Sequence, residues 1–368
     1  MSDTTAKEPS DAWLALMGMA PKRIPHRENL SNPDFVGLAS GIDPYEHPRE
    51  AALKAAELYP MAGVHVPDSD APVPRPEDGV TEDEHGRRRT RWGAGTSGYW
   101  DWGERFESID DVLAYEPLEH LDLREGRIVE DRDYSVSEDE LFRAWGGTED
   151  GLEPPEGEVR GAGFYNTMFM WPLLTFGWEL FLELAAGHKA ELRRLLEDFA
   201  EINRKVFRVF DRLPVNSVWC HDDICMARGP VCSPAWLREF IYPYYEEFFA
   251  IARSRTDRKI IFICDGCIDE VVDDVMACGA DGFISEPVTN WRAIARRYPK
   301  APIMGEGDNR ILMRNDPDEI EAMVRRMVET AGISGGYFMQ IGNHIPWNVP
   351  AEAVKLYFDL SRELAVRE

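Results

Sequence analysis

The second half of the chain alternates amphipathic segments with short apolar runs. Apolar side chains recur every three or four residues over 191–210, which predicts a helix with one face in the core. Ser233 and Pro234 signal the start of another helix, and Pro243 is expected to kink it. Asp316 and Pro317 predict the start of a third helix, and further helices are predicted at 48–58, 268–276 and 350–364.

Short apolar runs between these segments predict strands, at 62–67, 215–220, 259–264, 282–285, 301–305 and 336–341. Strands that alternate with helices at this pitch call for a parallel sheet, which either a doubly wound sheet or a (β/α)8 barrel would provide. No G-x-G-x-x-G follows the first candidate strand, and no G-x-x-x-x-G-K-[ST] occurs. The predicted fold class is therefore α/β, a (β/α)8 TIM barrel with an N-terminal extension and loop insertions.

The first half of the chain is less regular. We predict a tail over residues 1–25 and a single barrel domain over 26–368, with an irregular insertion around 68–150 that is rich in Pro, Gly and charge. Arg87, Arg88, Arg89 and Arg91 lie in this insertion. They are interpreted as a solvated loop or as a contact for an acidic partner.

The chain has 368 residues and a formal net charge of −26. This charge disfavours binding to nucleic acid or to an anionic membrane surface, because both need basic residues. No apolar run is long enough for a transmembrane helix, and the polar start lacks a signal-peptide pattern, so a cytoplasmic location is expected. The six cysteines all lie between Cys220 and Cys278, which favours free thiols or a metal site over disulfides.

Polar and thiol side chains follow most of the predicted strands. Because active sites of such barrels form at the C-terminal ends of the strands, we expect these groups to share one mouth. They are His221, Asp222, Asp223, Cys264, Asp265, Glu286, Glu306, Asp308, Asn343 and His344. Thiol, imidazole and carboxylate are ligands that zinc accepts.

Within this set, the predicted metal ligands are His221, Cys264 and His344, and the predicted catalytic residues are Asp222, Asp223 and Glu306. Adjacent strand residues point to opposite faces, so one member of the Asp222–Asp223 pair is expected to face the mouth. Simpler interpretations remain open, with His221 hydrogen-bonded to a neighbouring aspartate and the cysteines as ordinary buried thiols. The aromatic residues of 161–179 are interpreted as core or as a pocket for a flat apolar substrate.

From about residue 176 to 364 the chain resembles the uroporphyrinogen decarboxylase superfamily. The resemblance rests on FGWE (176–179), DDICMARGPVCSPAWLREFIYPYYEEF (222–248), FICDGCIDEVVDDVMACGADGF (262–283), EP (286–287) and GGYFMQIGNHIPWNVPAEAV (335–354). It implies a (β/α)8 barrel and one of two activities. Decarboxylases of this superfamily hold substrate carboxylates with an N-terminal arginine-rich segment, where this chain has only His26-Arg27-Glu28.

The other activity is corrinoid-linked methyl transfer, in which zinc activates the substrate and cobalamin is carried by a separate protein. Members that methylate thiols bind zinc with a His-x-Cys and a later Cys. Cys264 matches the first Cys, but Phe262 and Asn343 stand at the other two positions. The chain is thus more similar to members that demethylate methoxylated aromatics or quaternary amines.

The resemblance therefore implies a zinc-assisted methyltransferase. It would move a methyl group from a small donor, such as a methoxylated aromatic compound, to the cobalt of a corrinoid protein. No D-x-H-x-x-G stretch is present, so the corrinoid is expected to arrive on a partner. The alternatives are a tetrapyrrole decarboxylase and a non-catalytic barrel that acts as a binding module.

Overall fold

The computed structural model describes residues 8–75, 80–82, 88–91, 97–99, 106–122, 132–148, 157–165, 167–254 and 257–367. The chain divides into two compact units. Unit 1 comprises Met1–Thr81, Thr90–Gly98 and Phe283–Glu368, and unit 2 comprises Glu82–Arg89 and Tyr99–Gly282. Among the described residues no helix is long and apolar enough to cross a membrane. The single domain expected over residues 26–368 stays a prediction.

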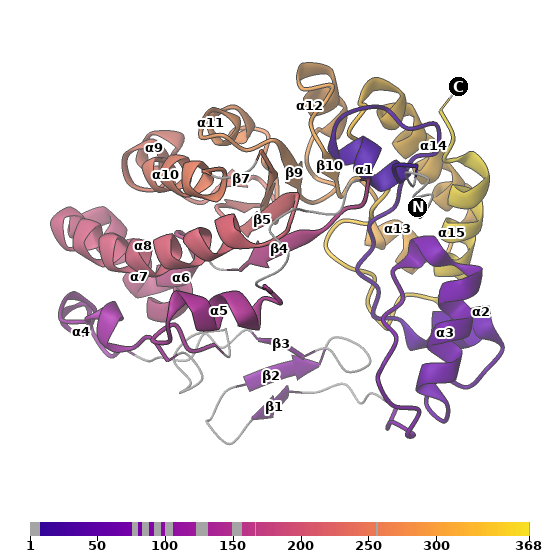
Figure 1. Cartoon of the computed structure of the whole chain (residues 1–368), viewed down its shortest axis with the longest axis horizontal. Coiled ribbons are helices and arrows are strands. Elements are labelled where there is room, and N and C mark those ends of the chain that lie inside the picture. Colours follow the sequence, from indigo (N-terminus) through magenta and orange to yellow (C-terminus); the bar gives the residue numbers. More distant parts are fainter. Residues whose placement is uncertain are drawn as a thin grey trace, which may run out of the picture. The chain divides into compact units, whose positions relative to one another are not determined.

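Unit 2 is built around three parallel strands, β4 (Gly161–Phe164), β5 (Ser217–His221) and β8 (Lys259–Ile263), of which β4 and β5 are labelled in Figure 1. All five residues of β5 pair with β8, from Ser217 opposite Lys259 to His221 opposite Ile263. The centre of β8 is fully buried, as expected for a strand covered on both faces. This pairing brings the C-terminal ends of β5 and β8 together.

The helices of unit 2 follow the predicted periodicity closely. The helix predicted over 191–210 is α8, and the one predicted from Ser233 is divided at Ile241 into α9 and α10, which places Pro243 in the first turn of α10, where a proline is tolerated. The Ser233 hydroxyl accepts a hydrogen bond from the Trp236 amide and so caps α9. The described helices are α4 (Ile109–Leu113), α5 (Glu138–Ala144), α6 (Met170–Phe176), α7 (Trp178–Gly187), α8 (Lys189–Arg212), α9 (Pro234–Phe240), α10 (Tyr242–Ala252) and α11 (Val272–Ala277).

Unit 1 continues the same parallel pattern. Strands β9 (Gly282–Ile284) and β10 (Ile303–Met304) pair in parallel, with Phe283 opposite Ile303 and Ile284 opposite Met304. The strand predicted at 336–341 is present only as isolated parallel bridges, which join Tyr337 to Ile303 and Ile341 to Gly307. His26 and Leu30 make parallel bridges to Met339 and Ile345 in turn. The predicted α/β class is therefore confirmed.

One predicted strand is wrong. In unit 1, Ala62 ends a 3-10 turn, η1 (Pro60–Ala62), and residues 63–67 are irregular. Gly63 adopts φ 63°, in the left-handed region, which ends the extended run that the apolar pattern suggested. A Cβ at this position would lie 2.9 Å from the carbonyl oxygen of Glu28, so the close approach of the two backbones also requires glycine.

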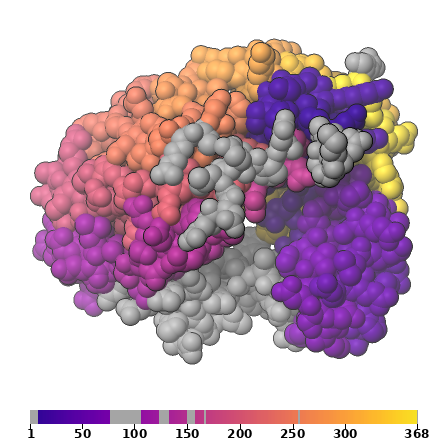
Figure 2. Space-filling view, viewed as in Figure 1, coloured from indigo at the N-terminus to yellow at the C-terminus, as the bar shows by residue number. Residues whose placement is uncertain are grey.

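The helices of unit 1 come from the N-terminal and the C-terminal parts of the sequence. They are α1 (Asp11–Leu16), α2 (Pro33–Ser40), α3 (Pro48–Leu58), α12 (Trp291–Arg297), α13 (Asn309–Arg314), α14 (Pro317–Ile333) and α15 (Ala351–Leu364). The predictions at 48–58, 316–317 and 350–364 are confirmed by α3, α14 and α15. Helices α2 and α3 lie at the surface of the unit (Figure 2, purple).

The predicted irregular insertion contains a small sheet with the order β1-β2-β3, formed by Val80–Glu82, Arg88–Arg91 and Ser97–Tyr99. Arg87 lies outside the described residues, and the side chains of Arg88, Arg89 and Arg91 are outside the description too. Their predicted contact with an acidic partner stays a prediction.

Phe199 on α8 provides a test of this core. Its side chain is 1% exposed, and its ring contacts those of Trp171 and Phe176 at centroid distances of 5.6 and 6.3 Å. We expect Phe199→Ala to lower the free energy of unfolding by about 3–5 kcal/mol, because it leaves a cavity. Glu201→Ala, on the exposed face of α8, should cost about 1 kcal/mol or less. Urea unfolding measures both, and equal losses would contradict the assigned face.

Candidate functional site

A histidine and two aspartates meet at the C-terminal ends of β5 and β8. His221 Nε2 lies 3.1 Å from Asp223 Oδ1, and the backbone N–H of Asp265 donates to the same oxygen at 2.6 Å. One ligand atom from each of His221, Asp223 and Asp265 lies within 4.8 Å of the others. An imidazole nitrogen and two carboxylates at this spacing could hold a divalent metal ion.

This His221–Asp223–Asp265 group remains accessible from outside. The side chains of His221 and Asp223 are 18% and 15% exposed. The ring of Tyr165, which follows β4, meets the imidazole edge-on at a centroid distance of 4.3 Å and fixes its plane. The imidazole is therefore held in one orientation, with a small part of its surface exposed.

The electrostatics of the group favour a positive charge. Burial of His221 opposes protonation, but the hydrogen bond with Asp223 and the negative charges of Asp223, Asp265 and Asp222 outweigh it and raise the pKa of His221. The same three carboxylates would attract a metal cation. A proton and a metal ion would then compete for the same atom, Nε2 of His221.

Asp222 has a different environment from its neighbour Asp223. It is fully buried, and its carboxylate accepts hydrogen bonds from the backbone N–H groups of Met168, Phe169 and Met170. The Tyr245 hydroxyl donates a fourth bond at 2.6 Å. Burial raises the pKa of Asp222, and these donors oppose the rise. Asp222 thus fastens the start of α6 to the end of β5, and only Asp223 joins the His221 group.

The thiols lie beside this group and not in it. Cys264 is fully buried, and its Sγ donates to the backbone carbonyl of Asp265 at 3.2 Å. Burial, followed by the hydrogen bond with the Cys225 thiol, raises the pKa of Cys264 well above its usual value. The Cys264 thiol thus lies outside the group formed by His221, Asp223 and Asp265, and its predicted ligand role stays a prediction. All six cysteines are free, as expected.

Glu306 belongs to unit 1 and follows β10. Its carboxylate accepts hydrogen bonds from the hydroxyls of Tyr337 at 2.7 Å and Thr330 at 3.1 Å, and Arg326 lies 3.5 Å away. Burial raises the pKa of Glu306 despite these partners. It lines a cavity of about 370 Å³ with Asp308 and with residues of α12, α13 and α14. Its predicted catalytic role stays a prediction.

His344 also belongs to unit 1, where its Nδ1 lies 3.2 Å from the side-chain oxygen of Asn343. Burial lowers the pKa of His344, which keeps its imidazole neutral at physiological pH. A neutral imidazole can bind a metal ion, so its predicted ligand role stays a prediction.

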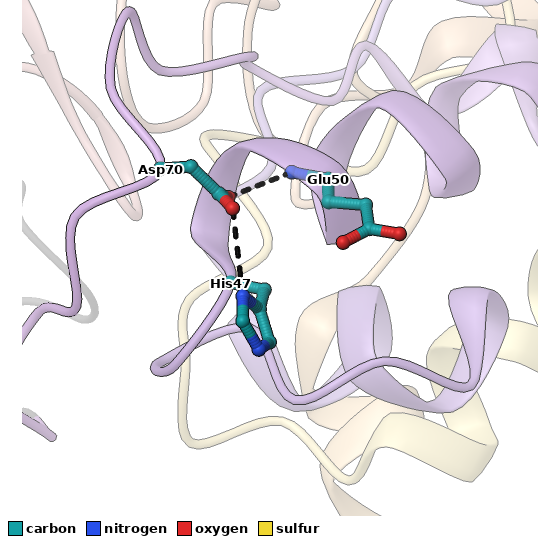
Figure 3. Close-up of side chains that lie close together, drawn as sticks. All are labelled: His47, Glu50 and Asp70. Carbon is teal, nitrogen blue, oxygen red and sulfur yellow. Dashed lines mark hydrogen bonds and ion pairs between the residues drawn. The ribbon is translucent and has the colours of Figure 1, made fainter.

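A second group of possible ligands, His47, Glu50 and Asp70, is explained by helix capping (Figure 3). Asp70 accepts hydrogen bonds from the backbone N–H groups of Arg49 and Glu50, in the first turn of α3. The N-cap residue His47 makes no cap bond of its own, and its Nδ1 lies 3.5 Å from Asp70. The hydrogen bond from Glu50 lowers the pKa of Asp70. All three side chains are exposed.

The sequence predicts roles for two members of this group, His221 and Asp223, and none for the third. It places Asp265 only among the strand-end residues and predicts its neighbour Cys264 as a metal ligand. Side chains of consecutive residues leave the backbone on different sides, and here Asp265 faces Asp223 while Cys264 is buried. The position of Asp265 just past the end of β8 is the sequence feature that indicates its place in the group.

Comparison with known proteins supports the fold. A family model described as uroporphyrinogen decarboxylase (URO-D) matches residues 169–364. A solved methyltransferase from Methanosarcina mazei is similar over 97% of this chain and 99% of its own, with a TM-score of 0.59 and 15% sequence identity. At this identity the likeness shows the fold alone. No curated protein matches the chain.

Replacement of Asp222 tests its structural role. In Asp222→Asn the amide NH2 would face backbone N–H donors, so we expect a loss of about 3 kcal/mol or more in the free energy of unfolding. Asp223→Asn, at the adjacent and partly exposed position, should cost about 1 kcal/mol. Urea titrations of the two variants provide the comparison, and an equal or reversed order would show that Asp222 does not anchor α6.

The raised pKa of His221 predicts a pH-dependent contribution to stability. Protonated His221 stabilises the folded state fully below the unfolded pKa of about 6.5, and this contribution is lost as the pH rises through the higher folded pKa. Without added metal, the stability difference between the wild type and His221→Gln should therefore be more in favour of the wild type at pH 6 than at pH 9. A difference that increases with pH would mean that folding favours neutral His221.

Proposed function

The chain belongs to the uroporphyrinogen decarboxylase family, and from this premise we propose that it is a methyltransferase that moves a methyl group from a small donor to a corrinoid. The donor would be a methoxylated aromatic compound, and the corrinoid would be carried by a separate protein in the cytoplasm. The proposal depends chiefly on one observation, the His221–Asp223–Asp265 group at the ends of β5 and β8. Strand ends are where barrels of this kind place their chemistry.

The donor set fits a metal ion of the kind this chemistry requires. Zinc accepts one imidazole and two carboxylates and leaves a position for substrate in such sites. We therefore assign His221, Asp223 and Asp265 as the zinc ligands, in place of the set His221, Cys264 and His344 expected from the sequence. When bound, the metal would stabilise the negative charge that develops on the donor oxygen as the methyl group leaves.

The remaining contacts position these ligands. The N–H of Asp265 donates to Asp223, which couples the ends of the two strands. Tyr165 packs against the imidazole of His221. Asp222 anchors the polypeptide between His221 and Asp223, which are the residues on either side of it. Such support around the ligands typically changes metal affinity by 10–100-fold when it is removed. Asp222 and Tyr165 are thus positioning residues.

Metal titration separates the two ligand sets. Zinc affinity, measured by competition with a chromophoric chelator, should fall by about 10-fold or more in His221→Ala, Asp223→Asn and Asp265→Asn. Cys264→Ser and His344→Ala should keep wild-type affinity, and His47→Ala controls for the exposed group on α3. Loss of zinc in Cys264→Ser with retention in Asp265→Asn would contradict our assignment.

Methyl transfer can be followed without the partner. Free cob(I)alamin and a panel of methoxylated aromatic acids and phenols should give methylcob(III)alamin, seen by its visible absorbance. Asp265→Asn should reduce the rate about 100-fold or more, since a lost Lewis acid costs several kcal/mol. Stepwise release of CO2 from uroporphyrinogen, with no methyl transfer, would show a decarboxylase instead. The absence of both reactions would favour a binding module.

A further inference from the structure

A cavity of about 860 Å³ opens in unit 2, beside the strand-end loops but lined by other residues. One wall is formed by Trp178 and Leu182, which share a face of α7 because they are four residues apart. Residues 226–234 also line it. They contain most of the hairpin of β6 (Cys225–Met226) and β7 (Gly229–Pro230) and lead into α9. Glu270 completes the lining. We refer to this space as the α7–hairpin cavity.

The walls of the α7–hairpin cavity are held in place from behind. The Cys267 amide donates to the carbonyl of Met226, and the Val231 amide donates to that of Ile224, both at 2.9 Å. Gly266 lies so close that an added Cβ would meet the backbone of Met226 at 2.5 Å. On the other side, the Trp236 indole donates to the carbonyl of Ala185 and ties α9 to α7. The cavity is thus formed before any ligand arrives.

The lining has the composition of a small-molecule site. Most of its residues are apolar, and Leu182 and Met226 expose 42% and 56% of their surface, so both can contact a ligand. Ligand sites of this kind span about 300–1,000 Å³ and combine apolar walls with a few polar groups that fix orientation. Here the charged groups are Arg228 and Glu270.

The charges restrict what such a ligand can be. Arg228 stands at the turn of the hairpin, and in the described part of the chain neither it nor Glu270 forms an ion pair. A Cβ at Gly229 would lie 3.4 Å from Glu270 Oε1, so this carboxylate lies against the hairpin at Gly229, the residue after Arg228. The guanidinium of Arg228 can bind one carboxylate of a ligand. A ligand with a second negative charge would be repelled by the carboxylate of Glu270.

We propose that the α7–hairpin cavity binds a flat apolar molecule with a single carboxylate, and that Arg228 recognises the carboxylate. Trp178, Leu182 and Met226 would cover the apolar body. This binding requires neither a metal ion nor a corrinoid, so it holds or fails separately from the methyl transfer proposed above.

Isothermal titration with 2-naphthoate, in metal-free buffer, tests the proposal against the uncharged 2-naphthalenemethanol. The wild type should bind 2-naphthoate at least about tenfold more tightly than the alcohol, since only the carboxylate can form a charge-assisted hydrogen bond with Arg228. Arg228→Gln should remove this preference and leave binding of the alcohol unchanged. Arg238→Gln, an exposed arginine on α9 outside the cavity lining, is the matched control and should behave like the wild type.

Two further variants test the walls. Leu182→Asp should weaken both probes by about tenfold or more, because it places a charge in the apolar wall. Glu270→Gln should strengthen binding of 2-naphthoate and leave the alcohol unaffected. Circular dichroism confirms that each variant is folded. Equal wild-type affinity for the two probes, no binding of either at millimolar concentration, or a preference retained in Arg228→Gln would overturn the proposal.

Discussion

The parallel pairing of β5 with β8 is the constraint on which the candidate site depends. Because the two strands run in the same direction and pair along their whole length, their C-terminal ends lie at one level. His221 and Asp223 leave the first strand at that level, and Asp265 leaves the second. The hydrogen bond between Asp265 and Asp223 then joins two turns that are 42 residues apart in the sequence. An antiparallel partner would have placed these residues at opposite edges.

Asp222 and Asp223 are adjacent in the sequence but differ in burial, and this difference separates a structural role from a role in the site. Asp222 satisfies four donors in a fully buried setting, where an unpaired charge would be prohibitively costly. Asp223 is partly exposed and faces an imidazole and another carboxylate. The hydrogen bonds of Asp222 fix the backbone at this point and so hold Asp223 in its position beside His221. This division favours one structural anchor and one ligand over a catalytic pair of carboxylates.

Much of the fold followed from the sequence. The continuous apolar run of β8 and the helical periodicity of α8 each specify an element without reference to partners. The segments 62–67 and 336–341 were harder, because whether an apolar run becomes a strand depends on backbone partners far away in the sequence. The left-handed Gly63 decided the first case, and isolated bridges replaced a regular strand in the second.

The site was predictable as a region but not as a ligand set. The sequence placed His221, Asp223, Cys264 and Asp265 at strand ends, yet the direction in which each side chain leaves the backbone depends on the loops that follow. Burial of Cys264 against Cys225 could not be read from the spacing of cysteines. The α7–hairpin cavity could not be predicted from the sequence either, because its lining comes from α7 and from a hairpin about 45 residues later in the sequence.

X-ray absorption spectroscopy of the zinc-loaded protein tests the central claim most directly. Zinc held by His221, Asp223 and Asp265 should show only nitrogen and oxygen neighbours, at about 2.0–2.2 Å. In Asp265→Asn that spectrum should be lost or altered. A sulfur neighbour at about 2.3 Å would instead identify a cysteine, and Cys264 before all others, as a ligand, and would contradict the assignment of His221, Asp223 and Asp265.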